Sequence, residues 1–224
     1  MNLCTSLRCG LLLLGTGAVL SAQSLNLNRV IDGIERHYNR LSSLQMGFEQ
    51  AVEYGGQRRM TESGTLYLQR PGKMRWDYAR PEGKIAISDG TIFRMYNPNS
   101  NQVRQVELEA MTDLRAPLSF LLGRMRLRRM FRNLRVEEAQ GKPMLIGDGR
   151  SARDVYRRVE FDFDPEGFGI TGIRIVGRDE SVNVYEFSGE RPNPSLAADL
   201  FEFEAPPGAE VVPLTGAFSD VPLE

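Results

Sequence analysis

Few residues in this chain have the chemistry of a catalytic nucleophile or of its base. The sequence contains one histidine, His37, and two cysteines, Cys4 and Cys9. A serine, threonine or cysteine nucleophile needs a neighbouring base, which is usually histidine. His37 falls within a predicted helix, where we interpret it as a surface or boundary residue, and both cysteines fall within a predicted leader. The residue types therefore disfavour a nucleophilic hydrolase.

Carboxylates alternate along one predicted strand at Glu160, Asp162 and Asp164. Paired carboxylates can hydrolyse glycosides, and clustered carboxylates can bind calcium. The alternate positions from Val159 to Phe163 are apolar, so the same pattern is typical of a strand with one solvated face, which we favour. The chain also lacks a glycine-rich phosphate loop after a strand and a helical His-Glu pair. We therefore expect a binding protein without catalytic residues, metal or cofactor.

The first 22 residues have the pattern of a secretory signal peptide. Arg8 precedes an apolar run centred on residues 11–14, and the small residues Ser21 and Ala22 follow. The run is shorter than the roughly 20 residues of a membrane-spanning helix. We predict export with cleavage near Ala22. Loss of Arg8 lowers the Lys+Arg count from 28 to 27 against 29 Asp+Glu, which gives the mature chain a net charge of −2.

Arginines cluster in one stretch of this otherwise balanced chain. They could contact phospholipid headgroups, nucleic acid or an acidic protein, or their stems could simply cover a helix and a strand. Export, the mildly acidic charge and the lack of interleaved aromatic residues disfavour nucleic acid. We assign possible partner docking to Arg124, Arg128 and Arg129. The complete cluster comprises Arg124, Arg126, Arg128, Arg129, Arg132 and Arg135.

After the leader, apolar residues first repeat with the period of a helix. Asn26 or Asn28 can cap its start. Gly33 within the stripe lowers helix stability by about 1 kcal/mol relative to alanine, so we expect the helix to depend on docking against a sheet. The amphipathic stripe comprises Leu27, Val30, Ile31, Ile34, Tyr38, Leu41 and Leu44.

Beyond Gln45 the apolar period changes to two, which indicates half-buried antiparallel strands. Met74, Trp76 and Tyr78, for example, alternate with charged residues. Turn signals such as Gly55-Gly56 and Gly189 separate about eleven such strands. One interruption, residues 116–131, predicts one or two short helices that could form a lid.

These elements predict a mainly β, α+β fold with three sequence regions. A long antiparallel meander can curl into an unclosed barrel roofed by helices, with an apolar interior. That interior is either a packed core or a cavity for a hydrophobic ligand. We expect the signal peptide at 1–22, the barrel with its lid helices at 23–212, and a loosely held tail at 213–224.

Several short motifs lie within this pattern. They are FEQ with Phe48 and Gln50, Gly64 in SGTLYLQRP, Arg70-Pro71, Trp76, Ser88-Asp89-Gly90, Tyr96-Asn97-Pro98, Gln102, Pro117 and FEFEAPPG near the end. In this order and spacing they resemble the LolA family of outer-membrane lipoprotein carriers of Gram-negative bacteria. The arginine-rich stretch and the residues beyond Gly208 depart from that family's pattern.

The resemblance implies a hydrophobic cavity that takes the acyl chains of lipoproteins. By the same resemblance Arg70 would be the latch that holds the lid shut. The lid would comprise Pro117, Leu118, Leu121 and Leu122. The acyl cavity would be lined by Phe48, Leu66, Leu68, Met74, Trp76, Ile87 and Met95.

The resemblance also implies a function and its partners. The protein would be a monomeric periplasmic chaperone that takes acylated lipoproteins from an inner-membrane ABC transporter to the outer-membrane receptor LolB. It would need no cofactor and bind no nucleic acid. Two alternatives remain open at this point. One is a lipid-sensing periplasmic regulatory domain of similar fold, as in the sensor RseB, and the other is an exported hydrolase.

Overall fold

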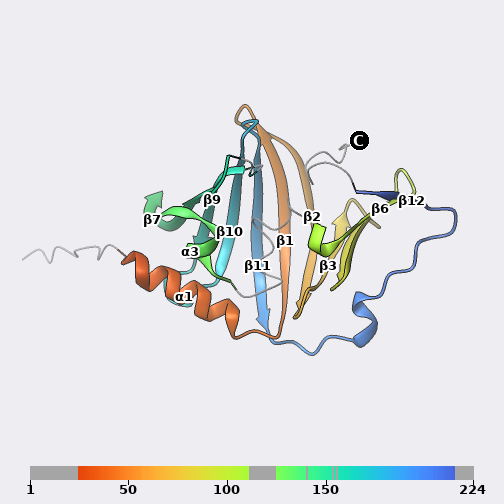
Figure 1. Ribbon diagram of the computed structural model, residues 1–224, viewed down its shortest axis with the longest axis horizontal. Helices are drawn as coiled ribbons and strands as arrows, with labels where there is room; N and C mark the ends of the chain where they lie inside the picture. The colour runs from red at the N-terminus through yellow and green to blue at the C-terminus, as the bar shows by residue number, and fades with distance from the viewer. Residues whose placement is uncertain (1–24, 111–124, 140, 153, 155, 215–224) are drawn as a thin grey trace, which may run out of the picture.

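The computed structural model describes residues 25–110, 125–139, 141–152, 154 and 156–214. Twelve strands among these residues form one sheet in the order β12-β6-β5-β4-β3-β2-β1-β11-β10-β9-β8-β7 (Figure 1). All neighbours are antiparallel except β12 and β6, which are parallel. The two ends of this order, β12 and β7, are not paired with each other. The predicted mainly β, unclosed fold is confirmed, with twelve described strands rather than about eleven.

The strand boundaries follow the alternation of apolar and polar residues. The strands are β1 Ser43–Tyr54, β2 Gln57–Gln69, β3 Lys73–Arg80, β4 Ile85–Asp89, β5 Ile92–Asn97, β6 Gln102–Glu107, β7 Arg132–Ala139, β8 Lys142–Asp148, β9 Tyr156–Phe163, β10 Ile170–Gly177, β11 Val182–Pro192 and β12 Glu210–Pro213. The helices are α1 Leu27–Asn39 and α3 Leu127–Met130, with short 3-10 helices η1 Leu108–Ala110 and η2 Ala198–Phe201.

Helix α1 begins where the sequence predicts and ends earlier. The Asn26 side chain accepts hydrogen bonds from the backbone N–H groups of Asn28 and Arg29, so Asn26 is the N-cap. The helix ends at Asn39, and Leu44 of the predicted stripe lies in β1. Gly33 is required by docking, because a Cβ atom there would lie 2.5 Å from the Phe168 ring. The extension of the helix to Leu44 was therefore wrong, although Leu44 is buried as the stripe predicts.

One side of the sheet, here called the inner face, carries rows of apolar side chains. Direct cross-strand pairing puts Met46, Leu66, Trp76, Ala86 and Met95 in one row. The adjacent row comprises Leu44, Leu68, Met74 and Phe93, with the buried polar Ser88 between Met74 and Phe93. Both rows join one core cluster with the buried residues of α1 and α3. The inner face is therefore the side on which the helices lie.

The opposite, outer face is partly covered by the segment after β11. Phe201 of η2 is buried, and the Lys73 ammonium lies 6.0 Å from the centre of its ring. The Arg75 guanidinium donates to the Leu200 carbonyl at 3.0 Å. Gly189, predicted as a turn, lies within β11 at φ 61°, close to the irregular pairing of β11 with β1. A glycine bend within the strand replaces the predicted turn.

Candidate functional site

Six of the seven predicted cavity residues lie together on the inner face. All are buried, with at most 3% of each residue exposed. Phe48 contacts Trp76 edge to face with ring centres 4.5 Å apart, and Trp76 lies 6.0 Å from the ring of Tyr185. The six residues are Phe48, Leu66, Leu68, Met74, Trp76 and Met95, and they form a continuous apolar surface across β1 to β5.

The seventh predicted residue, Ile87, lies on the outer face. It pairs directly with Arg75 on β3 and with Arg94 on β5, so its side chain is on the side of the sheet opposite Trp76. It is nevertheless buried, because η2 lies close to β3 and β4. The structure therefore separates Ile87 from the other six residues.

The end of the inner face nearest the β1–β2 turn carries a buried ion pair that the sequence reasoning missed. The Lys84 ammonium donates to the Glu62 carboxylate at 2.6 Å, and their side chains are only 10% and 7% exposed. Lys84 also lies over the Tyr78 ring at 4.5 Å. Glu62 and Lys84 stand two residues before Gly64 and Ala86, so strand alternation could have placed both on the inner face.

Three further residues adjoin this pair. Gln50 pairs directly with Glu62 on one side and with Tyr185 on the other. Burial and the nearby Glu62 charge raise the pKa of Tyr78 and the pKa of Tyr185 well above the ordinary tyrosine value. Both phenols therefore stay protonated. We call Gln50, Glu62, Tyr78, Lys84 and Tyr185 the inner-face polar cluster.

Arg70 lies at the end of β2, beside the C-terminus of α1. Its guanidinium donates to the carbonyl of Asn39 at 3.2 Å. The Asn39 side chain in turn clamps the backbone of Met125, accepting from its N–H at 2.7 Å and donating to its carbonyl at 2.9 Å. Glu35 accepts from the N–H of Leu127 at 2.7 Å. Arg70 therefore supports the part of α1 that holds residues 125–127 in place.

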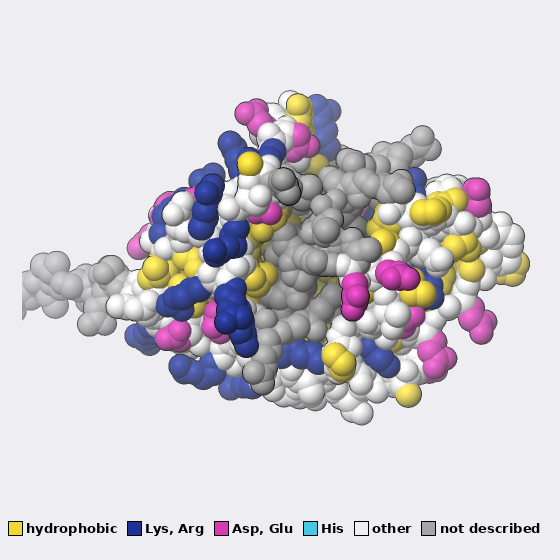
Figure 2. All heavy atoms as spheres, in the orientation of Figure 1, with side chains coloured by type: hydrophobic (Ala, Val, Ile, Leu, Met, Phe, Trp, Pro, Cys, Tyr) yellow, Lys and Arg dark blue, Asp and Glu magenta, His cyan; other side chains and the backbone are white. Residues whose placement is uncertain are grey.

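The predicted lid residues Pro117, Leu118, Leu121 and Leu122 lie outside the described residues, as does Arg124. The other two docking candidates lie in α3. Arg128 donates to Asn28 at 2.6 Å and lies 3.5 Å from Asp32, while Arg129 is exposed. Figure 2 shows basic side chains gathered on the side of the molecule where α1, α3 and β7 lie.

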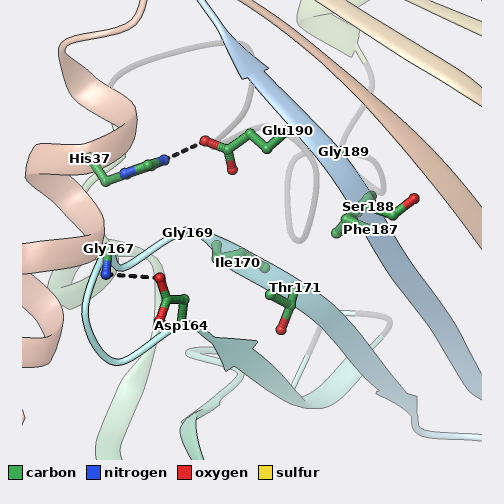
Figure 3. A pocket seen from close by; sticks show the side chains of 10 residues that line it. All are labelled: His37, Asp164, Gly167, Gly169, Ile170, Thr171, Phe187, Ser188, Gly189 and Glu190. Carbon is green, nitrogen blue, oxygen red and sulfur yellow. Dashed lines mark hydrogen bonds and ion pairs between the residues drawn. The ribbon is translucent and has the colours of Figure 1, made fainter.

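A separate depression of about 280 Å³ lies between the end of α1 and the splayed ends of β10 and β11 (Figure 3). His37 contacts the Glu190 carboxylate at 2.6 Å. The Tyr38 hydroxyl donates to Glu190 at 3.1 Å and accepts from the N–H of Ile170 at 2.7 Å. We call His37, Tyr38 and Glu190 the α1 polar cluster. His37 is thus a half-buried boundary residue with a structural hydrogen bond to Glu190.

The acidic residues of the predicted alternation form ion pairs on the sheet and hydrogen bonds in a turn. Glu160 lies 3.0 Å from Arg158 and 3.5 Å from Arg174, and Asp164 accepts from the N–H groups of Glu166 and Gly167. Within the described ranges, no group of three or more histidine, aspartate or glutamate residues could hold a metal ion. Nor does any helix there have the length and apolarity to cross a membrane.

This geometry defines a class of fold. It is an open, mostly antiparallel sheet with an apolar inner face, covered at one side by the N-terminal helix. Residues 39–204 match the family model described as "Outer membrane lipoprotein carrier protein LolA". The chain belongs to the LolA family.

Individual relatives agree with this assignment at modest identity. The outer-membrane lipoprotein carrier protein of Nitrosospira multiformis is 28% identical over 155 residues, which cover 68% of this chain and 72% of the relative. That of Dechloromonas aromatica is 26% identical over 183 residues, covering 81% and 86%. A crystal structure of a conserved protein from Thermus thermophilus shares the fold, with a TM-score of 0.52 at 11% identity, covering 84% and 98%.

Proposed function

We propose that this protein is a periplasmic carrier that binds the acyl chains of lipoproteins and delivers them to an outer-membrane receptor. The observation that carries the proposal is the continuous apolar inner face of β1 to β5, in a chain of the LolA family. Three of its side chains, Met46, Met74 and Met95, are flexible methionines that adapt to irregular apolar partners. Such a surface can pack against its own chain when empty and against acyl chains when loaded.

Energetics explain why a carrier is needed. Each buried methylene contributes about 0.8 kcal/mol, so an acyl chain of about 16 carbons gains on the order of 10 kcal/mol by staying in an apolar phase. A carrier must offer similar burial and still release its cargo. A stable empty state with a closed lid favours release, because closing the lid recovers free energy when the acyl chains leave.

The finer assignments follow from this role. We infer that residues 117–122 form the lid and that Arg70 stabilises its closed state, because Arg70 supports the α1 residues that hold the chain directly after the lid. The donor would be the inner-membrane ABC transporter and the acceptor LolB. The exposed Arg128 and Arg129 would dock a partner. The role is non-catalytic and uses no cofactor.

Two measurements test the carrier role. Acylated proteins should co-purify with the mature protein from the periplasm, and mass spectrometry identifies them. In vitro, the single tryptophan Trp76 lies within the inner face, so its fluorescence should change when a diacyl lipopeptide binds. The same peptide without acyl chains is the control. An unchanged spectrum at saturating lipopeptide would contradict acyl binding next to Trp76.

Neighbouring residues on opposite faces provide a matched pair of variants. Met95 faces inward, while Arg94 faces outward and pairs with Asp89 at 2.8 Å. Met95→Gln should weaken lipopeptide binding, because it introduces an amide into the apolar layer. Arg94→Gln should leave binding unchanged. Equal effects of the two variants would contradict binding on the inner face.

A further inference from the structure

The inner-face polar cluster is an unusual feature in an apolar layer. Register places its members side by side, since Gln50 lies between Glu62 and Tyr185. Phe48 and Trp76 adjoin it, with the ring centre of Phe48 5.1 Å from that of Tyr78. The cluster therefore lies at the end of the surface that we propose holds acyl chains.

Hydrogen bonding within the cluster is incomplete. The Lys84 ammonium donates to Oε1 of Glu62. Among the described residues, however, the hydroxyls of Tyr78 and Tyr185 make no hydrogen bond. The buried Oε1 atom of Gln50 accepts from no donor. Buried polar groups normally have partners. The cluster thus offers two hydroxyl donors and one acceptor to a ligand.

The charge balance of the cluster selects the chemistry of that ligand. Glu62 and Lys84 neutralise each other, and an additional buried charge would have no counter-ion. A neutral ligand with carbonyl oxygens matches the two hydroxyl donors, and an amide N–H matches the Gln50 oxygen. Neutral carbonyls of this kind occur where an acyl chain is joined to the rest of an acylated molecule by an ester or an amide.

We propose that the inner-face polar cluster is a subsite for the neutral ester and amide linkages of acylated ligands, with Tyr78 and Tyr185 donating to linkage carbonyls and Gln50 accepting from an amide. This inference rests on the proposed carrier function and deepens it. The apolar rows bind any long hydrocarbon, whereas the cluster distinguishes ester- or amide-linked chains from hydrocarbons without carbonyls. Glu62 and Lys84 act as positioning residues.

The test compares two synthetic lipopeptides with the same peptide, one carrying two ester-linked palmitoyl chains and the other two ether-linked hexadecyl chains. Isothermal titration calorimetry with the mature protein should show about tenfold tighter binding of the diester, as expected for two neutral hydrogen bonds. The double variant Tyr78→Phe/Tyr185→Phe should bring the two dissociation constants together by weakening only diester binding. Its urea unfolding midpoint should match the wild type, because neither hydroxyl has a partner to lose among the described residues.

Tyr156→Phe is the control, since it removes a phenol hydroxyl near Phe131, on the other half of the sheet. It should retain the preference for the diester. The ratio of the diether to the diester dissociation constant is compared between the wild type and the double variant. An unchanged ratio would overturn the subsite while leaving the carrier function intact. Failure of both lipopeptides to bind would overturn the carrier function and the subsite together. Tighter binding of laurate than of methyl laurate would also overturn the subsite, because it would show anion recognition.

Discussion

The α1 polar cluster and the inner-face polar cluster differ in how fully their atoms are paired. In the α1 polar cluster, Glu190 accepts from both His37 and Tyr38, and the Tyr38 hydroxyl also accepts from the N–H of Ile170. In the inner-face polar cluster the ion pair is made, but the hydroxyls of two tyrosines make no hydrogen bond in the described residues. The first cluster holds α1 on the sheet, whereas the second keeps hydrogen-bonding capacity for a ligand.

Breaking the Glu62–Lys84 pair should produce the largest effect. Glu62→Gln leaves the Lys84 ammonium buried without a counter-ion, so the free energy of unfolding should fall by about 3–5 kcal/mol. The double variant Glu62→Gln/Lys84→Met removes both charges and should recover most of the loss. Urea unfolding measures both. A loss below about 1 kcal/mol in the single variant would mean that water reaches the pair, and the cluster would then not be a dry subsite.

Arg70 connects the strand that carries Glu62 to the helix that carries Tyr38. Arg70→Leu removes the charged donor to Asn39, a hydrogen bond worth roughly 1.5–3 kcal/mol. If that free energy stabilises the closed lid, apparent cargo affinity should rise about tenfold to a hundredfold and transfer to the receptor should slow. Release of radiolabelled lipoprotein from the purified complex measures this. Arg59→Leu, at an exposed arginine of β2, is the control. Transfer at the wild-type rate by Arg70→Leu would contradict the latch.

Sequence patterns predicted the apolar rows better than the polar cluster, for a physical reason. Period-two alternation assigns a face to each residue of a half-buried strand, and it placed Met74 and Trp76 correctly on one side. Ile87, which the family resemblance placed in the cavity, lies on the outer face. Alternation does not show this because β4 is buried on both faces: η2, more than a hundred residues later, lies over its outer side. The Glu62–Lys84 pair depends on cross-strand register and on side chains 22 positions apart, which alternation does not reveal.

The tyrosines of the two clusters offer a direct comparison at neutral pH. Tyr38→Phe removes the acceptor of the Ile170 N–H and a donor to Glu190, so the free energy of unfolding should fall by about 1–3 kcal/mol. Tyr185→Phe removes a hydroxyl that has no partner among the described residues. It should change the free energy of unfolding by less than about 0.5 kcal/mol. Chemical denaturation at pH 7 measures both values. A loss at Tyr185 equal to that at Tyr38 would show that the Tyr185 hydroxyl already has a structural role.

High pH should affect the two tyrosines alike, because burial raises the pKa of both. Burial, together with Glu190 at Tyr38 and Glu62 at Tyr185, raises the pKa of each phenol in the folded state. In the unfolded chain the pKa is about 10. A raised folded-state pKa gives stability that is complete below pH 10 and declines as the pH rises toward the folded value, since only the unfolded chain then releases the proton.

At pH 10.5 each tyrosine should therefore lower the free energy of unfolding by about 0.8 kcal/mol relative to pH 8. Tyr185→Phe and Tyr38→Phe should each reduce the pH-dependent loss by that amount, although they differ at pH 7. Urea unfolding at the two pH values decides this, and an unchanged loss in Tyr185→Phe would mean that its hydroxyl reaches water in the folded protein.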